Sequence, residues 1–93
     1  MKYTEVVKAI VEHVGGKDNI SVATHCMTRL RLNLKDSSKV EEDALKKLDG
    51  VMGVVNKGQQ TQIIIGASVN EVYTEFIEYT GMKEEAPVEE NLD

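Results

Sequence analysis

The sequence has few of the residues that stabilise small secreted or metal-bound domains. It contains one cysteine, one proline, no tryptophan and one phenylalanine among 93 residues. One cysteine cannot close an internal disulfide, and secreted domains of this size usually carry several, so we expect a reducing, cytosolic compartment. One cysteine and two separated histidines offer no pair of metal ligands at a useful spacing, so we expect no metal site.

Long apolar runs and an excess of basic charge are also missing. No apolar stretch approaches the ~20 residues that cross a bilayer, and the N-terminus lacks a signal-peptide pattern. The net charge of −5 is uneven, because residues 83–93 hold one lysine and five acidic residues while the rest of the chain is nearly neutral. Without a basic excess, nucleic-acid binding is disfavoured. The sequence also has no nucleotide-binding loop, so we expect no cofactor.

Apolar periodicity predicts three amphipathic helices. The first covers residues 3–14 and ends at Gly15-Gly16, because glycine adopts the left-handed conformation of helix ends without a Cβ clash. Two capping boxes, at residues 38–41 and 68–71, are predicted to start the second and third helices. Gly50 and Gly81 are predicted to end them.

Four strands are predicted between these helices, over residues 19–25, 28–34, 51–55 and 60–65. In the second strand three leucines alternate with Arg29, Arg31 and Asn33, so the two sets face opposite sides. Short turns make each strand pair an antiparallel hairpin, and the element order is α-β-β-α-β-β-α. We expect an α+β, two-layer sandwich, with three helices on one face of a four-stranded antiparallel sheet and the arginine side open to solvent.

The helical periodicity stops near Gly81, and the remaining residues are acidic. We therefore expect one domain over residues 1–82, without an internal repeat or a second domain. Residues 83–93 are expected to form a disordered linker or a C-terminal stub.

Cys26 lies in the short segment between the first two predicted strands, and Arg29 and Arg31 follow it. Cationic neighbours lower the pKa of a thiol from ~8.5, because they favour the charged thiolate. Guanidinium groups also bind phosphate oxygens through paired hydrogen bonds. Backbone amides of Cys26, Met27 and Thr28, with the Thr28 hydroxyl, are candidates for an anion-binding nest. These features are typical of a cysteine that carries a phosphoryl group, and we expect Arg29 to lie closer to that group than Arg31.

Structural interpretations of the same residues stay open at this point. A lone cysteine is often a small buried apolar residue, and two arginines in alternate positions of a strand often form a solvated face. His25 precedes Cys26 directly, but adjacent strand residues point to opposite faces. It is a candidate phosphate ligand or proton handler, or an exposed residue at a strand end.

The segment Cys26-Met27-Thr28-Arg29-Leu30-Arg31 resembles the C-x-T-R-L-R motif of enzyme IIB domains of the glucose superfamily in the bacterial sugar phosphotransferase system. The resemblance extends through residues 49–54 and 62–66 and covers residues 3–80. In that family the cysteine takes a phosphoryl group from a phosphohistidine of a IIA domain and passes it to a sugar carried by the membrane IIC domain. The resemblance implies a protein-phosphocysteine–sugar phosphotransferase, in which Cys26 becomes phosphocysteine and the two arginines serve transfer to sugar.

The resemblance also implies the partners and their place. The donor is a IIA domain, and the acceptor is a sugar on a IIC domain, associated or fused C-terminally, at the cytosolic face of the bacterial inner membrane. Residues 24–26 are more similar to the branches for β-glucosides, sucrose or trehalose than to the glucose branch. The alternative is a non-enzymatic regulatory or interaction module with the same fold.

Overall fold

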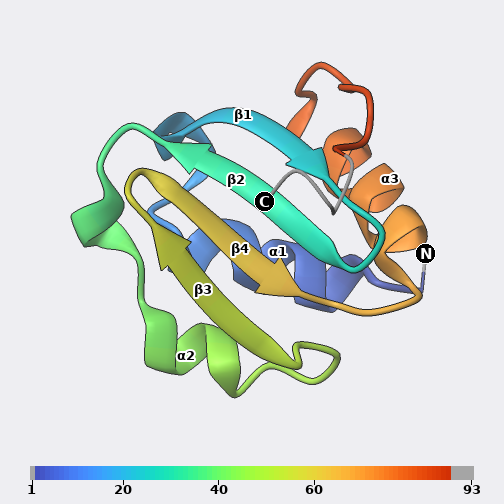
Figure 1. The fold of residues 1–93 in the computed structure, drawn as a ribbon, viewed down its shortest axis with the longest axis horizontal. Coiled ribbons are helices and arrows are strands. Elements are labelled where there is room, and N and C mark those ends of the chain that lie inside the picture. Colours follow the sequence, from blue (N-terminus) through green and yellow to red (C-terminus); the bar gives the residue numbers. More distant parts are fainter. Residues whose placement is uncertain (1, 89–93) are drawn as a thin grey trace.

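A computed structural model describes residues 2–88, which form one sheet and three α-helices (Figure 1). The elements are α1 (Thr4–His13), a 3₁₀ turn (Lys17–Asn19), β1 (Ile20–His25), β2 (Arg29–Leu34), a second 3₁₀ turn (Ser37–Lys39), α2 (Glu42–Lys46), β3 (Gly53–Lys57), β4 (Gln60–Ile64) and α3 (Val69–Thr80). This order confirms the predicted α+β fold, with the two 3₁₀ turns added.

The four strands form one antiparallel sheet in the order β1-β2-β4-β3. Strands β1 and β3 are its edges, and β2, which carries both arginines, lies between β1 and β4. The register places Arg31 opposite Thr24 on one side and opposite Gln62 on the other. The strand that carries the arginines is therefore fixed by hydrogen bonds on both of its sides.

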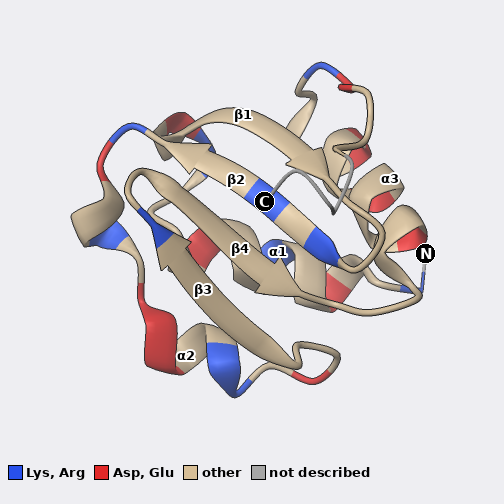
Figure 2. Cartoon of the chain, in the orientation of Figure 1, with Lys and Arg blue, Asp and Glu red and all other residues tan. Residues whose placement is uncertain are grey.

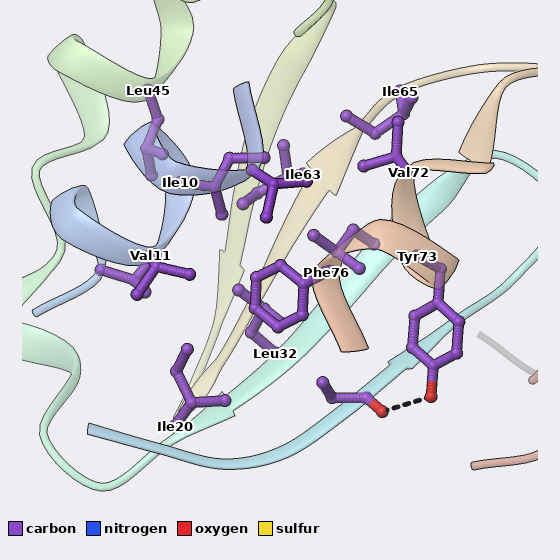
Figure 3. Close-up of a cluster of buried hydrophobic side chains, with 14 of the residues drawn as sticks. Ile10, Val11, Ile20, Leu32, Leu45, Ile63, Ile65, Val72, Tyr73 and Phe76 are labelled. Carbon is purple, nitrogen blue, oxygen red and sulfur yellow. Dashed lines mark hydrogen bonds between the residues drawn. The ribbon is translucent and has the colours of Figure 1, made fainter. Parts of the chain in front are cut away.

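The core lies between the sheet and the helices and is mostly aliphatic, as the scarcity of aromatic residues requires. Phe76 of α3 lies near its centre, among side chains from α1 and the sheet (Figure 3). All three helices contribute buried residues, and the three leucines of β2 are 0–1% exposed. The buried set is Val7, Ile10, Val11, Val14, Ile20, Ala23, Leu30, Leu32, Leu34, Leu45, Ile63, Ile65, Val69, Val72, Tyr73 and Phe76. Each large apolar side chain so buried contributes ~1.5–3 kcal/mol.

Neither predicted capping box forms. Glu41 and Ser68 occupy the N-cap positions of α2 and α3, but their side chains accept no capping hydrogen bond. Instead, Asp36 accepts hydrogen bonds from the Ser38 amide and hydroxyl, at 3.0 and 2.6 Å. Because Ser38 is hydrogen bonded to Asp36, it does not cap an α-helix, and the chain makes a 3₁₀ turn at residues 37–39. Helix α2 therefore starts later and is shorter than predicted.

Other element ends lie close to their predicted places. Gly81 ends α3 in the left-handed conformation, at φ +72°, and its amide donates to Ile77 O at 2.8 Å. Strand β3 begins at Gly53, two residues later than predicted. The length of the third helix was therefore predictable from its stop signal, while the start of β3 was not.

The face opposite the helices is less open than predicted. Arg31 is 4% exposed, Gln62 1% and Thr24 9%. Figure 2 shows the basic segments of β2, and none of the four strands carries an acidic residue. This face is therefore positively charged but partly closed to solvent.

Residues 83–88, which we call the C-terminal strap, are hydrogen bonded to the domain. Ala86 O accepts from Thr24 Oγ1 at 3.0 Å, and the Val88 amide donates to His25 O at 2.7 Å. The Glu85 amide donates to Tyr73 Oη at 2.8 Å. A disordered linker or C-terminal stub was expected over residues 83–93, but residues 83–88 are hydrogen bonded to β1 and to Tyr73 of α3. The expected boundary at residue 82 stays a prediction, and residues 89–93 lie outside the described residues.

Candidate functional site

Cys26 occupies the turn between β1 and β2, with its side chain turned inward. Its amide donates to Arg29 O at 3.0 Å, which closes the turn. The cysteine is 0% exposed, whereas Met27 at the tip of the turn is 75% exposed. The sulfur thus lies directly beneath an exposed loop.

A second segment fixes this turn from the end of β4. Thr28 O accepts hydrogen bonds from the amides of Ile65 and Gly66, both at 2.8 Å. Gly66 has φ +90°, a conformation that strains other residues, so the chain can reverse here and bring two successive amides to one carbonyl. The position of the turn is therefore set by β1, β2 and the segment after β4 together.

Hydrogen-bond donors surround the sulfur and favour its charged form. Burial by itself raises the pKa of the Cys26 thiol. The Thr28 amide, the Arg31 guanidinium and the Arg29 amide oppose this by donating to the sulfur, and the charge of Arg31 adds to them. The net result is a pKa below the ordinary value of 9.0. The predicted phosphate nest of the Cys26, Met27 and Thr28 amides stays a prediction. The amides that donate to the sulfur are those of Thr28 and Arg29, and the Cys26 amide donates to Arg29 O.

The two arginines reach from β2 toward different neighbouring strands. Arg31 donates to the sulfur of Cys26, which lies diagonally across the β1–β2 pair. Arg29 Nη1 donates to Gln62 Oε1 at 2.8 Å, diagonally across the β2–β4 pair. Diagonal neighbours lie ~7–8 Å apart at Cα, within reach of a long side chain. Arg31, rather than Arg29, therefore bonds the sulfur.

Gln62 belongs to this site and was missed in the sequence. Its Oε1 faces Arg29, since a guanidinium only donates, and its Nε2 donates to Gln60 Oε1 at 2.8 Å. Gln60 Nε2 in turn donates to Asn33 Oδ1 at 2.8 Å. A row of side-chain hydrogen bonds thus runs along the β2–β4 pair, from Arg29 through Gln62 and Gln60 to Asn33. Glutamines at alternate positions of a predicted strand next to the arginine strand were the available signal.

His25 contacts the cysteine through the backbone. Its Nδ1 lies 2.9 Å from Cys26 O, and because a carbonyl only accepts, Nδ1 carries the proton. Its ring lies 4.5 Å from the Tyr73 ring, on the helix side of the sheet with Leu30. His25 is buried, so its interpretation as an exposed strand-end residue is wrong. The geometry gives it a supporting contact with the turn.

Residues 2–88 contain no group of three or more histidine, cysteine, aspartate or glutamate side chains that could hold a metal ion. Within the same residues, no helix has the length and apolar character needed to cross a membrane.

Comparison with known proteins agrees with this geometry. A family described as phosphotransferase system, EIIB, matches residues 8–41. The chain is 44% identical over 89 residues to a PTS system beta-glucoside-specific EIIBCA component from Halalkalibacterium halodurans, covering 96% of this chain and 14% of that protein. It is 47% identical over 78 residues to a PTS system trehalose-specific EIIBC component from Bacillus subtilis, covering 83% of this chain and 17% of that protein.

A solved structure shares the whole fold. It is the crystal structure of one domain of a PTS system IIabc component from Clostridium difficile, with 32% identity and a TM-score of 0.81. The alignment covers 96% of this chain and 93% of that one. The curated relatives are much longer, and this chain spans under a fifth of the length of the two described above. The chain belongs to the EIIB family of the phosphotransferase system.

Proposed function

We propose that Cys26 carries a phosphoryl group between a IIA domain and a sugar. The observation that carries this proposal is the set of donors on the Cys26 sulfur, two amides and the Arg31 guanidinium, which holds the thiol pKa below 9.0. A thiolate is the nucleophilic form of cysteine. The same donors are suited to phosphate oxygens once the sulfur is phosphorylated.

The reaction has two steps. In the first, the Cys26 thiolate attacks the phosphorus of a phosphohistidine; the S–P bond forms, the N–P bond breaks, and the imidazole nitrogen keeps the electron pair. In the second, a sugar hydroxyl attacks the phosphorus; an O–P bond forms, the S–P bond breaks, the thiolate leaves with the electron pair, and the hydroxyl proton passes to solvent. Such transfers depend mainly on alignment and on charge stabilisation, which Arg29 and Arg31 supply.

The partners are a IIA domain as donor and a membrane IIC domain with its sugar as acceptor. The relatives named as EIIBC and EIIBCA components support this assignment. β-Glucosides, sucrose and trehalose are the proposed sugars, and the cytosolic face of the bacterial inner membrane is the proposed location.

A phosphorylation assay tests the proposal. The chain is incubated with a phosphorylated IIA domain and analysed by intact mass and peptide mapping, beside the Cys26→Ser variant. We expect one phosphoryl group on Cys26 in the wild type and none in the variant. Phosphate on His13 or His25, or no phosphorylation by any IIA domain of the β-glucoside, sucrose and trehalose systems, contradicts the proposal; the last result favours the interaction module.

A further inference from the structure

The buried state of Cys26 raises the question of how a donor reaches it. Phosphoryl transfer needs the phosphorus atom within bonding distance of the sulfur, on an open line of approach. In this structure Cys26 is 0% exposed. The turn that carries it must therefore move before the sulfur can accept a phosphoryl group.

The C-terminal strap is connected to both peptide groups that flank Cys26. The Val88 amide donates to His25 O, which belongs to the peptide group before Cys26. On the other side, the Glu85 amide donates to Tyr73 Oη, the Tyr73 ring packs against His25, and His25 Nδ1 donates to Cys26 O. Both series of contacts thus link the strap to the peptide groups on either side of Cys26.

The strap is also the most weakly held of the segments that restrain this turn. Its described residues belong to no helix or strand, and most of them are exposed. It is attached by three hydrogen bonds, at Glu85, Ala86 and Val88. The turn's other restraints are its connections to β1 and β2, which are paired in the sheet, and the amides of Ile65 and Gly66, which donate to Thr28 O. Segments with few buried contacts open first.

We propose that the strap, residues 83–88, controls access to Cys26. While it is seated on β1, it holds the two flanking peptide groups and keeps the sulfur buried. When it leaves β1, both flanking peptide groups lose these restraints, and the turn brings the sulfur to the surface. This regulation rests on the proposed function, because it concerns acceptance of the phosphoryl group.

Proline substitutions in the strap test this without altering the domain. The double variant Glu85→Pro/Val88→Pro lacks both amide donors, whereas its matched control, Glu85→Ala/Val88→Ala, keeps them. Each full chain is alkylated with iodoacetamide over a range of pH. The rate at high pH reports access to the sulfur, and the midpoint reports the thiol pKa.

We expect the proline variant to show a high-pH rate on the order of tenfold above wild type, the effect of losing two ordinary hydrogen bonds, with the same midpoint. The alanine control should match wild type. Equal high-pH rates in the proline and alanine variants overturn the proposal. If the proline variant does not fold, a chain ending at Met82 replaces it, with the same two outcomes.

Single-turnover phosphorylation by a phosphorylated IIA domain then separates the two proposals. Faster acceptance in the proline variant supports both. Faster alkylation with no phosphorylation of any variant contradicts the proposed function and leaves control of access by the strap standing. Normal phosphorylation of wild type with identical rates in all variants contradicts only the role of the strap.

Discussion

Cys26 shows how a few donors outweigh burial at one residue. Removing a thiolate from water disfavours its charge and raises the thiol pKa. Here two backbone amides and one guanidinium donate to the sulfur, and the pKa is lowered instead. Arg31 contributes both a hydrogen bond and a full charge, so it is the side chain on which the activated thiol depends most.

The thiol titration tests this balance. We expect a wild-type midpoint below the ~8.5 of a free thiol and a higher one in Arg31→Gln, which loses the charge. Because the folded pKa is lowered, the thiolate stabilises the folded protein above the unfolded pKa, and this contribution is lost as pH falls through the folded pKa. The free energy of unfolding of wild type relative to Cys26→Ser should therefore increase as pH rises from the folded pKa to the unfolded pKa of ~8.5. Thiolate absorbance and urea unfolding measure these quantities, and a wild-type midpoint at or above ~8.5 contradicts the expectation.

Arg29 is expected to act mainly in transfer to sugar. Its side chain is bonded to Gln62 rather than to the sulfur, so the thiolate does not depend on its guanidinium. Arg29→Lys keeps the charge but loses the planar pair of donors that suits phosphate. We expect acceptance from the IIA domain close to wild type and transfer to sugar slower by ~10²-fold. Rapid-quench assays of phosphoryl acceptance and of transfer to sugar, on wild type, Arg29→Lys and Arg31→Lys, measure both rates. If Arg29→Lys slows both half-reactions equally, Arg29 acts in thiolate activation instead.

At the scale of elements, the row of side chains across β2 and β4 joins the site to the sheet. Gln62 is buried and uses its oxygen on Arg29 and its nitrogen on Gln60. Gln62→Leu keeps a similar volume but leaves both partners without this bond. Arg29 and Gln60 are partly buried, and leaving such groups unsatisfied costs on the order of 1 kcal/mol, so the variant should be less stable although it is more apolar. Urea unfolding beside Gln59→Leu, an exposed glutamine in the β3–β4 turn, checks this, and equal or higher stability of Gln62→Leu would show that the row contributes nothing.

The elements themselves were largely predictable because their signals are local. Three leucines alternating with polar residues define β2, and Gly81 marks the end of α3. The predictions failed where the outcome depends on competing partners. Ser38 is hydrogen bonded to Asp36 and so does not form the predicted capping box. Which backbone amides donate to the Cys26 sulfur depends on the conformation of the turn.

The same limit applies to the site. Cys26 and its arginines were predictable from residue type and spacing. The sequence did not predict that Arg31, rather than Arg29, donates to the sulfur. This depends on which of its two neighbouring strands each arginine side chain extends toward. The position of the strap on β1 was not predictable either. Two of its three hydrogen bonds use backbone amides, which are the same in every residue type except proline.

For the whole molecule, the strap is expected to contribute to stability as well as to access. Removing a disordered linker or stub, as expected from the sequence for residues 83–93, would leave stability nearly unchanged. Three hydrogen bonds to Thr24, His25 and Tyr73 predict a loss of ~1–3 kcal/mol instead. A chain ending at Met82 should melt several degrees below the full chain. A chain ending at Val88 keeps all three bonds and serves as control; equal melting temperatures for the Met82 and Val88 chains would contradict the prediction.

The bond between Val88 and His25 places the end of the described chain beside the nucleophile. Val88, the last described residue, donates to the carbonyl of His25, which directly precedes Cys26. A domain fused to the C-terminal side of this chain would be tethered at the reaction centre rather than at a remote corner. A short tether of this kind gives effective concentrations in the millimolar range. Transfer to such a partner would not depend on a tight docking surface, so the face around Cys26 would be left available to the other partner.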